Sequence, residues 1–115
     1  IKCIFECNSD ELQLEMVMSS ALFRILQEAL TNISKHANAA NVEVHLFVDD
    51  QMVSLEVRDD GIGIGIGASA KPDAFGIRGI HERIEQLRGW VEIHSQPNNG
   101  TTLMLSVPRD QPLLN

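Results

Sequence analysis

Apolar residues recur at two different periods along this chain, and the period distinguishes expected helices from expected strands. From about residue 16 to 37 they fall at helical spacing with no glycine or proline between them, and they fall at helical spacing again from Ile77 to Leu87, ahead of Gly89. Apolar and polar residues instead alternate over 42–48, 53–57 and 103–107, and the short segments 1–7 and 91–93 also have strand character. The predicted order is therefore strand, helix, hairpin, loop, helix, hairpin.

The two hairpins exclude an all-parallel, doubly wound sheet. Their turns are supplied by Asp49-Asp50-Gln51 and Asn98-Asn99-Gly100. The simplest fold is an α/β two-layer sandwich, in which a mixed, largely antiparallel sheet carries the helices on one face. At 115 residues the chain is expected to form one domain, 1–115, with a frayed tail over 109–115.

Charge and composition narrow the class of partner. Nine Lys and Arg stand against sixteen Asp and Glu, for a net charge of −7, and aromatic residues make up only 4%, which argues against nucleic acid and anionic membrane surfaces. Cys3 and Cys7 are too far apart on an extended strand for a disulfide, and no apolar run is long enough to cross a membrane. We expect a cytoplasmic domain of a longer protein, with any membrane anchor elsewhere in that protein.

A polar stripe on the first predicted helix carries candidate metal and phosphate ligands. Glu28, Asn32 and Lys35 lie at positions i, i+4 and i+7, and His36 flanks them. A carboxylate, a carboxamide and two potential cations could hold a hydrated Mg²⁺ and its phosphates, because Mg²⁺ takes few protein oxygens and keeps its waters. An ordinary solvated helix face is the alternative, and the stripe alone favours it.

Two polar side chains are expected to point into the core from strand ends. Counting by twos from Val53 places Asp59 on the core side, where an unpaired carboxylate is costly. It could accept a hydrogen bond from the exocyclic amine of adenine, from backbone N–H groups of the following loop, or from both. The same parity turns Thr101 inward, where a hydrogen bond to backbone is the simpler expectation.

The loop over about residues 60–76 is too long for a routine connection and is rich in glycine. Its first glycines, Gly61 and Gly63, belong to neither a Rossmann fingerprint nor a Walker motif. Gly76 and Gly79 span the entry to the second helix, where backbone N–H groups and the helix dipole suit phosphate. A plain turn before a helix is the alternative, since two glycines are a weak signal.

Four motifs together resemble the ATP-binding domain of sensor histidine kinases, most closely the branch whose regulators carry helix-turn-helix output domains. The similarity covers nearly the whole chain in order. The chain departs from that branch at Ile62 and Ile64, where Arg and Phe are common, and at Trp90, where a second glycine is usual. The motifs are Glu28-Ala-Leu-Thr-Asn32-Ile-Ser-Lys35-His36-Ala37, Asp59-Asp-Gly61-Ile-Gly63, Gly76-Ile-Arg-Gly79-Ile-His-Glu-Arg83 and Gly100-Thr101-Thr102.

This resemblance implies the ATP-binding fold shared by histidine kinases, DNA gyrase, heat-shock-90 chaperones and mismatch-repair ATPases, with residues 60–76 as a mobile lid. It implies that Asn32 coordinates Mg²⁺, that Glu28 helps to hold the metal or acts as an acid–base partner, and that Asp59 accepts the adenine amino hydrogen. It also implies that Gly61 and Gly63 let the backbone approach the nucleotide closely, and that Gly76 and Gly79 line the phosphates. Lys35 or His36 would offset the phosphate charge, and Thr101 would complete the adenine end of the site.

The implied activity is transfer of the ATP γ-phosphate to a histidine on a dimerisation domain, in a two-component system with a response regulator. The chain shows no such dimerisation segment, and its histidines do not suit the acceptor role: His45 is expected to face outward, His81 to lie inside a helix and His94 in a terminal strand. We therefore expect no autophosphorylation by this chain alone. The alternatives are a serine-directed anti-sigma-type kinase or gyrase-type ATPase of the same fold, and a non-catalytic nucleotide-binding or docking module.

Overall fold

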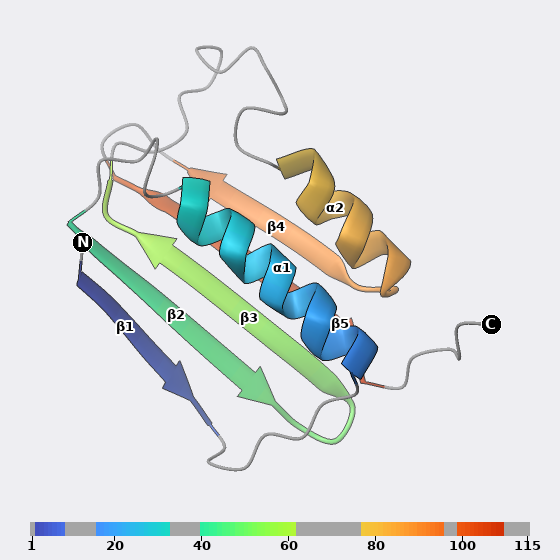
Figure 1. The fold of residues 1–115 in the computed structure, drawn as a ribbon. Coiled ribbons are helices and arrows are strands. Elements are labelled where there is room, and N and C mark those ends of the chain that lie inside the picture. Colours follow the sequence, from blue (N-terminus) through green and yellow to red (C-terminus); the bar gives the residue numbers. More distant parts are fainter. Residues whose placement is uncertain (1, 9–15, 33–39, 62–76, 96–98, 110–115) are drawn as a thin grey trace.

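The computed structural model describes residues 2–8, 16–32, 40–61, 77–95 and 99–109 (Figure 1). Within these ranges the predicted order of elements is confirmed, and the first helix agrees with its expected span as far as Asn32, with 33–37 outside the described residues. The elements are β1 (Lys2–Cys7), α1 (Met16–Asn32), β2 (Asn41–Val48), β3 (Met52–Asp59), α2 (Ile77–Gln86), β4 (Trp90–Ser95) and β5 (Thr101–Pro108).

The strands form one sheet in the order β1-β2-β3-β5-β4. β1 pairs with β2 in parallel, and the other three pairs are antiparallel, so the expected mixed, largely antiparallel sheet is confirmed. The parallel pair requires a crossover connection, and α1 lies in that connection. This order places β5 beside β3 in the interior of the sheet and leaves β1 and β4 at the edges.

Both helices lie against the same face of the sheet, which confirms the two-layer α/β arrangement (Figure 1). Each helix buries one apolar stripe: Ile25 on α1 is 0% exposed and Ile84 on α2 is 1% exposed. Burial of each such side chain contributes about 1.5–3 kcal/mol relative to exposure, so this shared core fixes where the two helices sit. The buried core comprises Leu22, Ile25, Ala29, Val42, Val44, Val53, Leu55, Val57, Ile80, Ile84, Leu87, Leu103, Leu105 and Val107.

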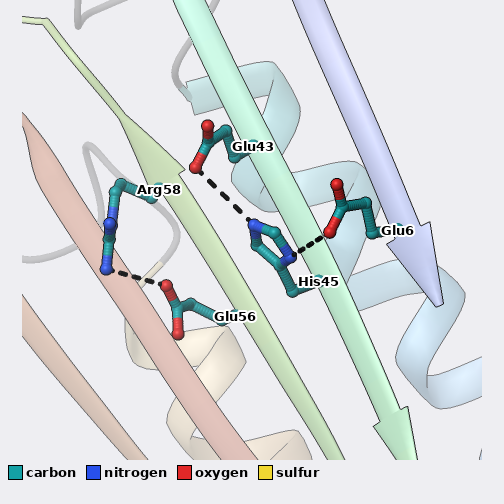
Figure 2. A network of polar contacts seen from close by, with 5 residues as sticks. All are labelled: Glu6, Glu43, His45, Glu56 and Arg58. Atoms are coloured by element: carbon teal, nitrogen blue, oxygen red, sulfur yellow. Dashed lines mark ion pairs between the residues drawn. The ribbon is translucent and has the colours of Figure 1, made fainter. Parts of the chain in front are cut away.

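The opposite face of the sheet carries charged side chains (Figure 2). His45 on β2 has Nδ1 3.4 Å from a carboxylate oxygen of Glu6 and Nε2 3.6 Å from one of Glu43, and Arg58 lies 3.0 Å from Glu56 on β3. These contacts are well exposed to solvent, so each contributes little to stability. The expected outward orientation of His45 is confirmed.

Two further expectations concern the cysteines and the chain end. Cys3 and Cys7 are free thiols, as predicted. Arg109, the first residue of the predicted frayed tail, is held to the β2–β3 turn, because its backbone N–H donates to the carbonyl of Gln51 at 2.8 Å and its side chain donates to the carbonyl of Asp49. Residues 110–115 lie outside the described part.

No helix among the described residues has the length and apolar character needed to cross a bilayer.

Candidate functional site

Several elements carrying predicted site residues meet at one end of the fold. α1 ends there at Asn32, β3 ends there at Asp59, and α2 begins there at Ile77 (Figure 1). β5 runs antiparallel to β3, so it begins at the same end with Thr101. The topology therefore gathers polar side chains that are far apart in sequence.

Asp59 is the last residue of β3, and its side chain is buried, with 4% of the residue exposed. Strand parity predicted this orientation, because Val53, Leu55 and Val57 face the same core. Its Oδ1 accepts a hydrogen bond from the backbone N–H of Gly61 at 2.8 Å. The expected bond to the following loop is therefore confirmed, and a carboxylate retains capacity for a further donor.

The environment of Asp59 shifts its acidity. Burial raises the pKa of the Asp59 carboxyl above its ordinary value, hydrogen bonds from the backbone N–H groups of Gly61 and Thr101 lower it in part, and the charge of Asp60 raises it again. The net shift is upward. A buried carboxylate in this state gains from an additional neutral donor that replaces the water it has lost.

Gly100 packs directly against the backbone of Asp59. Its φ is +80°, and a Cβ at this position would overlap the carbonyl oxygen of Asp59 and lie 2.8 Å from its carbonyl carbon, so only glycine fits. Gly100 was interpreted from sequence as part of a turn and a motif, without a role of its own. Its place before a strand in Asn-Asn-Gly was the available signal for a left-handed backbone.

Thr101 follows at the start of β5 and is half-buried on the inner face. The simpler expectation for its hydroxyl, a bond to backbone, is corrected by the structure: the hydroxyl donates to Oγ of Ser95 at 3.1 Å. The cause is the β4–β5 register, which sets Ser95 directly opposite Thr101. The hydroxyl pair lies beside the strand end that carries Asp59.

Asp60 is a second carboxylate at this end, and sequence reasoning assigned it no role. Its Oδ1 accepts the backbone N–H groups of Ala40 and Asn41 at 2.9 Å each, and its Oδ2 accepts the side-chain amide of Asn41 at 2.8 Å. Hydrogen bonds from Asn41, with a smaller one from Ala40, hold the pKa of Asp60 below its ordinary value. Asp60 thus ties the start of β2 to the end of β3.

Glu28 lies one helical turn before the end of α1 and pairs with α2. Its Oε2 accepts a hydrogen bond from Nη1 of Arg83 at 2.7 Å, and the two side chains are 36% and 30% exposed. Gly79 sits over this pair, because a Cβ there would lie 3.1 Å from Nη1 of Arg83 and 3.6 Å from each carboxylate oxygen of Glu28. The structure therefore brings two predicted residues, Glu28 and Gly79, together.

Sequence reasoning gave Arg83 no role, although a signal was present. Arg83 follows Gly79 by four residues, so both lie on one side of α2. The remaining candidates stay predictions, because Lys35, His36, Gly63, Gly76 and the side chain of Asn32 lie outside the described part. The same applies to residues 62–76 of the predicted lid.

Sequence comparison identifies relatives of known kind. The family described as histidine kinase-, DNA gyrase B- and HSP90-like ATPase matches residues 18–111. The histidine-protein kinase/phosphatase DegS of Brevibacillus brevis is 39% identical over 88 residues, which is 76% of this chain and 22% of DegS. The oxygen sensor histidine kinase NreB of Staphylococcus carnosus is 38% identical over 91 residues, 79% of this chain and 26% of NreB. The chain thus spans about a quarter of the length of these relatives.

Structural comparison supports the same fold. Histidine kinase AdeS of Acinetobacter baumannii superposes with a TM-score of 0.75 over 96% of this chain and 55% of that chain, at 15% identity. The α/β two-layer fold expected from the order of helices and strands therefore matches the fold of a histidine kinase, as the resemblance implied. The chain belongs to the histidine kinase-, DNA gyrase B- and HSP90-like ATPase family, as an ATP-binding domain of the kind found in sensor histidine kinases.

Proposed function

We propose that this chain binds ATP with Mg²⁺ and donates the γ-phosphate to a histidine on a dimerisation domain outside the chain. The observation that carries this proposal is the buried carboxylate of Asp59, 4% exposed at the end of β3. An ionised carboxylate accepts hydrogen bonds and cannot donate them, so it selects a ligand edge that presents an N–H. Adenine presents an amino group at the position where guanine has a carbonyl oxygen.

The neighbours of Asp59 suit the base of such a ligand. Gly61, whose N–H already orients Oδ1 of Asp59, has no side chain to keep a planar ring away from the backbone. The paired hydroxyls of Thr101 and Ser95 add polar groups at the start of β5. Gly63 would extend the same backbone surface in this proposal.

The residues on α1 suit the metal. Oε2 of Glu28 is held by Arg83, and among the described residues no donor bonds to Oε1. A carboxylate oxygen of this kind fits a hard cation that keeps most of its waters, and Asn32, four residues later, brings a carboxamide to the same stripe. When bound, Mg²⁺ would neutralise part of the negative charge of the phosphates. The proposed phosphate contacts are Lys35, His36, Gly76 and Gly79.

Catalysis in this proposal is mostly positioning, as in phosphoryl transfer generally. The acceptor imidazole nitrogen forms a bond to the γ-phosphorus while the bond to the bridging oxygen breaks, and ADP leaves. Glu28 accepts the proton that the imidazole releases. The phosphohistidine then donates its phosphoryl group to a response regulator. Use of ATP and the free thiols of Cys3 and Cys7 fit a cytoplasmic domain. In this proposal the domain contacts neither nucleic acid nor the membrane directly.

Phosphoryl transfer to a supplied dimerisation domain tests this function. We would mix the chain with Mg²⁺, γ-labelled ATP and the dimerisation domain of a DegS-type relative, with a control domain whose acceptor histidine is replaced. The expected result is label on the intact domain alone, labile in acid and stable in alkali, as phosphohistidine is. Acid-stable label on serine would support the anti-sigma-type kinase instead. Phosphate release without labelled protein would support a gyrase-type ATPase, and binding without either would support a docking module.

A further inference from the structure

The ion pair between Glu28 and Arg83 joins the two helices at the functional end of the fold. The 2.7 Å contact uses one atom from each side chain, Nη1 of Arg83 and Oε2 of Glu28. The second carboxylate oxygen, Oε1, accepts no hydrogen bond from any residue in the described ranges. One oxygen is therefore fixed by α2, while the other has no partner among the residues that the structure describes.

Gly79 fits closely against this pair. A methyl group at position 79 would lie 3.1 Å from Nη1 of Arg83, so the guanidinium would have to move by a few tenths of an ångström. The absence of a side chain therefore lets α2 approach Glu28 and lets Arg83 reach it. Gly79 lies in the first turn of α2, and the space left by its missing side chain is occupied by the guanidinium of Arg83.

Stability is a weak explanation for the pair. Both side chains are about one-third exposed, at 30% and 36%, and isolated pairs with that exposure contribute little to folding free energy. The helices are already fixed by their buried stripes, which include Ile25 and Ile84. Among the described residues the pair occupies one carboxylate oxygen of Glu28, and a hydrogen bond of this kind suits the outer-shell partners that orient metal ligands in proteins.

We propose that Arg83 is a positioning residue for the phosphoryl-transfer site: it holds Oε2 of Glu28 so that Oε1 faces the Mg²⁺ that binds with ATP. This inference rests on the proposed function, because it presumes that Glu28 serves the metal. Arg83 itself does not contact the nucleotide. Its loss therefore reduces the part of the ATP affinity that depends on Mg²⁺ and leaves the metal-free affinity unchanged.

Calorimetry on the 115-residue chain tests this separation. The affinity for a non-hydrolysable ATP analogue is measured with and without Mg²⁺, together with the melting temperature, for wild type, Arg83→Gln and Arg83→Lys. The matched control is Arg58→Gln, which removes another arginine–glutamate pair, at 3.0 Å, on the opposite face of the sheet. Arg83→Lys keeps the positive charge but not the planar geometry of the guanidinium, so it carries the test if Arg83→Gln fails to fold.

We expect Arg83→Gln to reduce the Mg²⁺-dependent gain in affinity by about tenfold, the lower end of typical outer-shell effects. Arg83→Lys reduces this Mg²⁺-dependent gain less than Arg83→Gln does, and Arg58→Gln leaves it unchanged. An equal loss with and without Mg²⁺ would overturn the inference by showing direct nucleotide contact or general damage. An unchanged or increased gain would also overturn it. Absence of nucleotide binding in wild type would instead overturn the proposed function and the inference with it.

Discussion

Asp59 and Asp60 are adjacent in the chain, yet their carboxylates point to different surroundings and their pKa values shift in opposite directions. Asp59 is buried and accepts the N–H of Gly61, and burial raises its pKa. Asp60 is exposed and accepts hydrogen bonds from Ala40 and Asn41, which lower its pKa. Successive side chains point to opposite sides, so Asp59 faces the core while Asp60 ties the end of β3 to the start of β2.

Asp59→Asn should stabilise the nucleotide-free chain at neutral pH. The folded-state pKa of Asp59 lies above its ordinary value of 3.8, so the stability that this carboxyl contributes is fully present below pH 3.8 and is lost as pH rises through the folded-state pKa. Asparagine removes that loss and can still accept the N–H of Gly61. Melting curves from pH 3 to 8 should show the variant gaining a few degrees over wild type as pH rises. A variant that melts below wild type at pH 7 would contradict this account.

Asp60→Asn should show the opposite pH dependence. The folded-state pKa of Asp60 lies below 3.8, so its contribution to stability is present above that pH and is lost as pH falls through the folded-state pKa. The variant should therefore melt below wild type at pH 7 and approach it in acid. The same series of melting curves measures both variants, and parallel behaviour of the two would show that their environments have been assigned wrongly.

Gly100→Ala should lower both stability and nucleotide affinity. The added methyl group would overlap the backbone of Asp59 at a φ of +80°, so Asp59 must move, at a cost of about 1–3 kcal/mol. Gly89→Ala is the matched control, because its methyl group would overlap the backbone of Ser106, which is not a site residue. Thermal melting should fall in both variants, whereas affinity for an ATP analogue should fall only in Gly100→Ala. An equal loss of affinity in both variants would show that Gly100 has no specific role in nucleotide binding.

The sequence was sufficient to predict the fold class and the inward side chain of Asp59, because both follow from local periodicity, whereas the strand order β1-β2-β3-β5-β4 depends on non-local pairing. The alternation of apolar and polar residues fixed which face of β3 is buried. The helical spacing of apolar residues around Ile25 and around Ile84 marked the buried stripes of the two helices. Glu28 was predicted from its helical stripe and the family resemblance. Its partner Arg83 lies 55 positions away, and no local pattern links residues at that separation.

The roles of Asp60 and Gly100 were missed for the same reason. The carboxylate of Asp60 reaches across the sheet end to Asn41, and Gly100 meets the backbone of Asp59, so each role appears only after the strands pair. The hydroxyl bond of Thr101 likewise depends on the β4–β5 register, which turn composition alone does not fix.

The two faces of α1 should respond very differently to truncation. Ile25 is 0% exposed and packs in the core, so Ile25→Ala should cost about 2–5 kcal/mol. Phe23 is 65% exposed, so Phe23→Ala should change stability by no more than about 0.5 kcal/mol. Urea unfolding of both variants gives the two free energies. A comparable loss in both would mean that the buried stripe of α1 is not the one described.

Nucleotide selectivity tests the central claim most directly, since Asp59 is proposed to recognise the amino group of adenine. Calorimetry should compare non-hydrolysable ATP and GTP analogues, in the presence of Mg²⁺, on wild type and Asp59→Asn. We expect wild type to prefer the ATP analogue by at least about tenfold and the variant to lose that preference while remaining folded, because one hydrogen bond to a charged group is worth about 1.5–3 kcal/mol. Binding of neither analogue by wild type at millimolar concentration, or an unchanged preference in Asp59→Asn, would contradict the account.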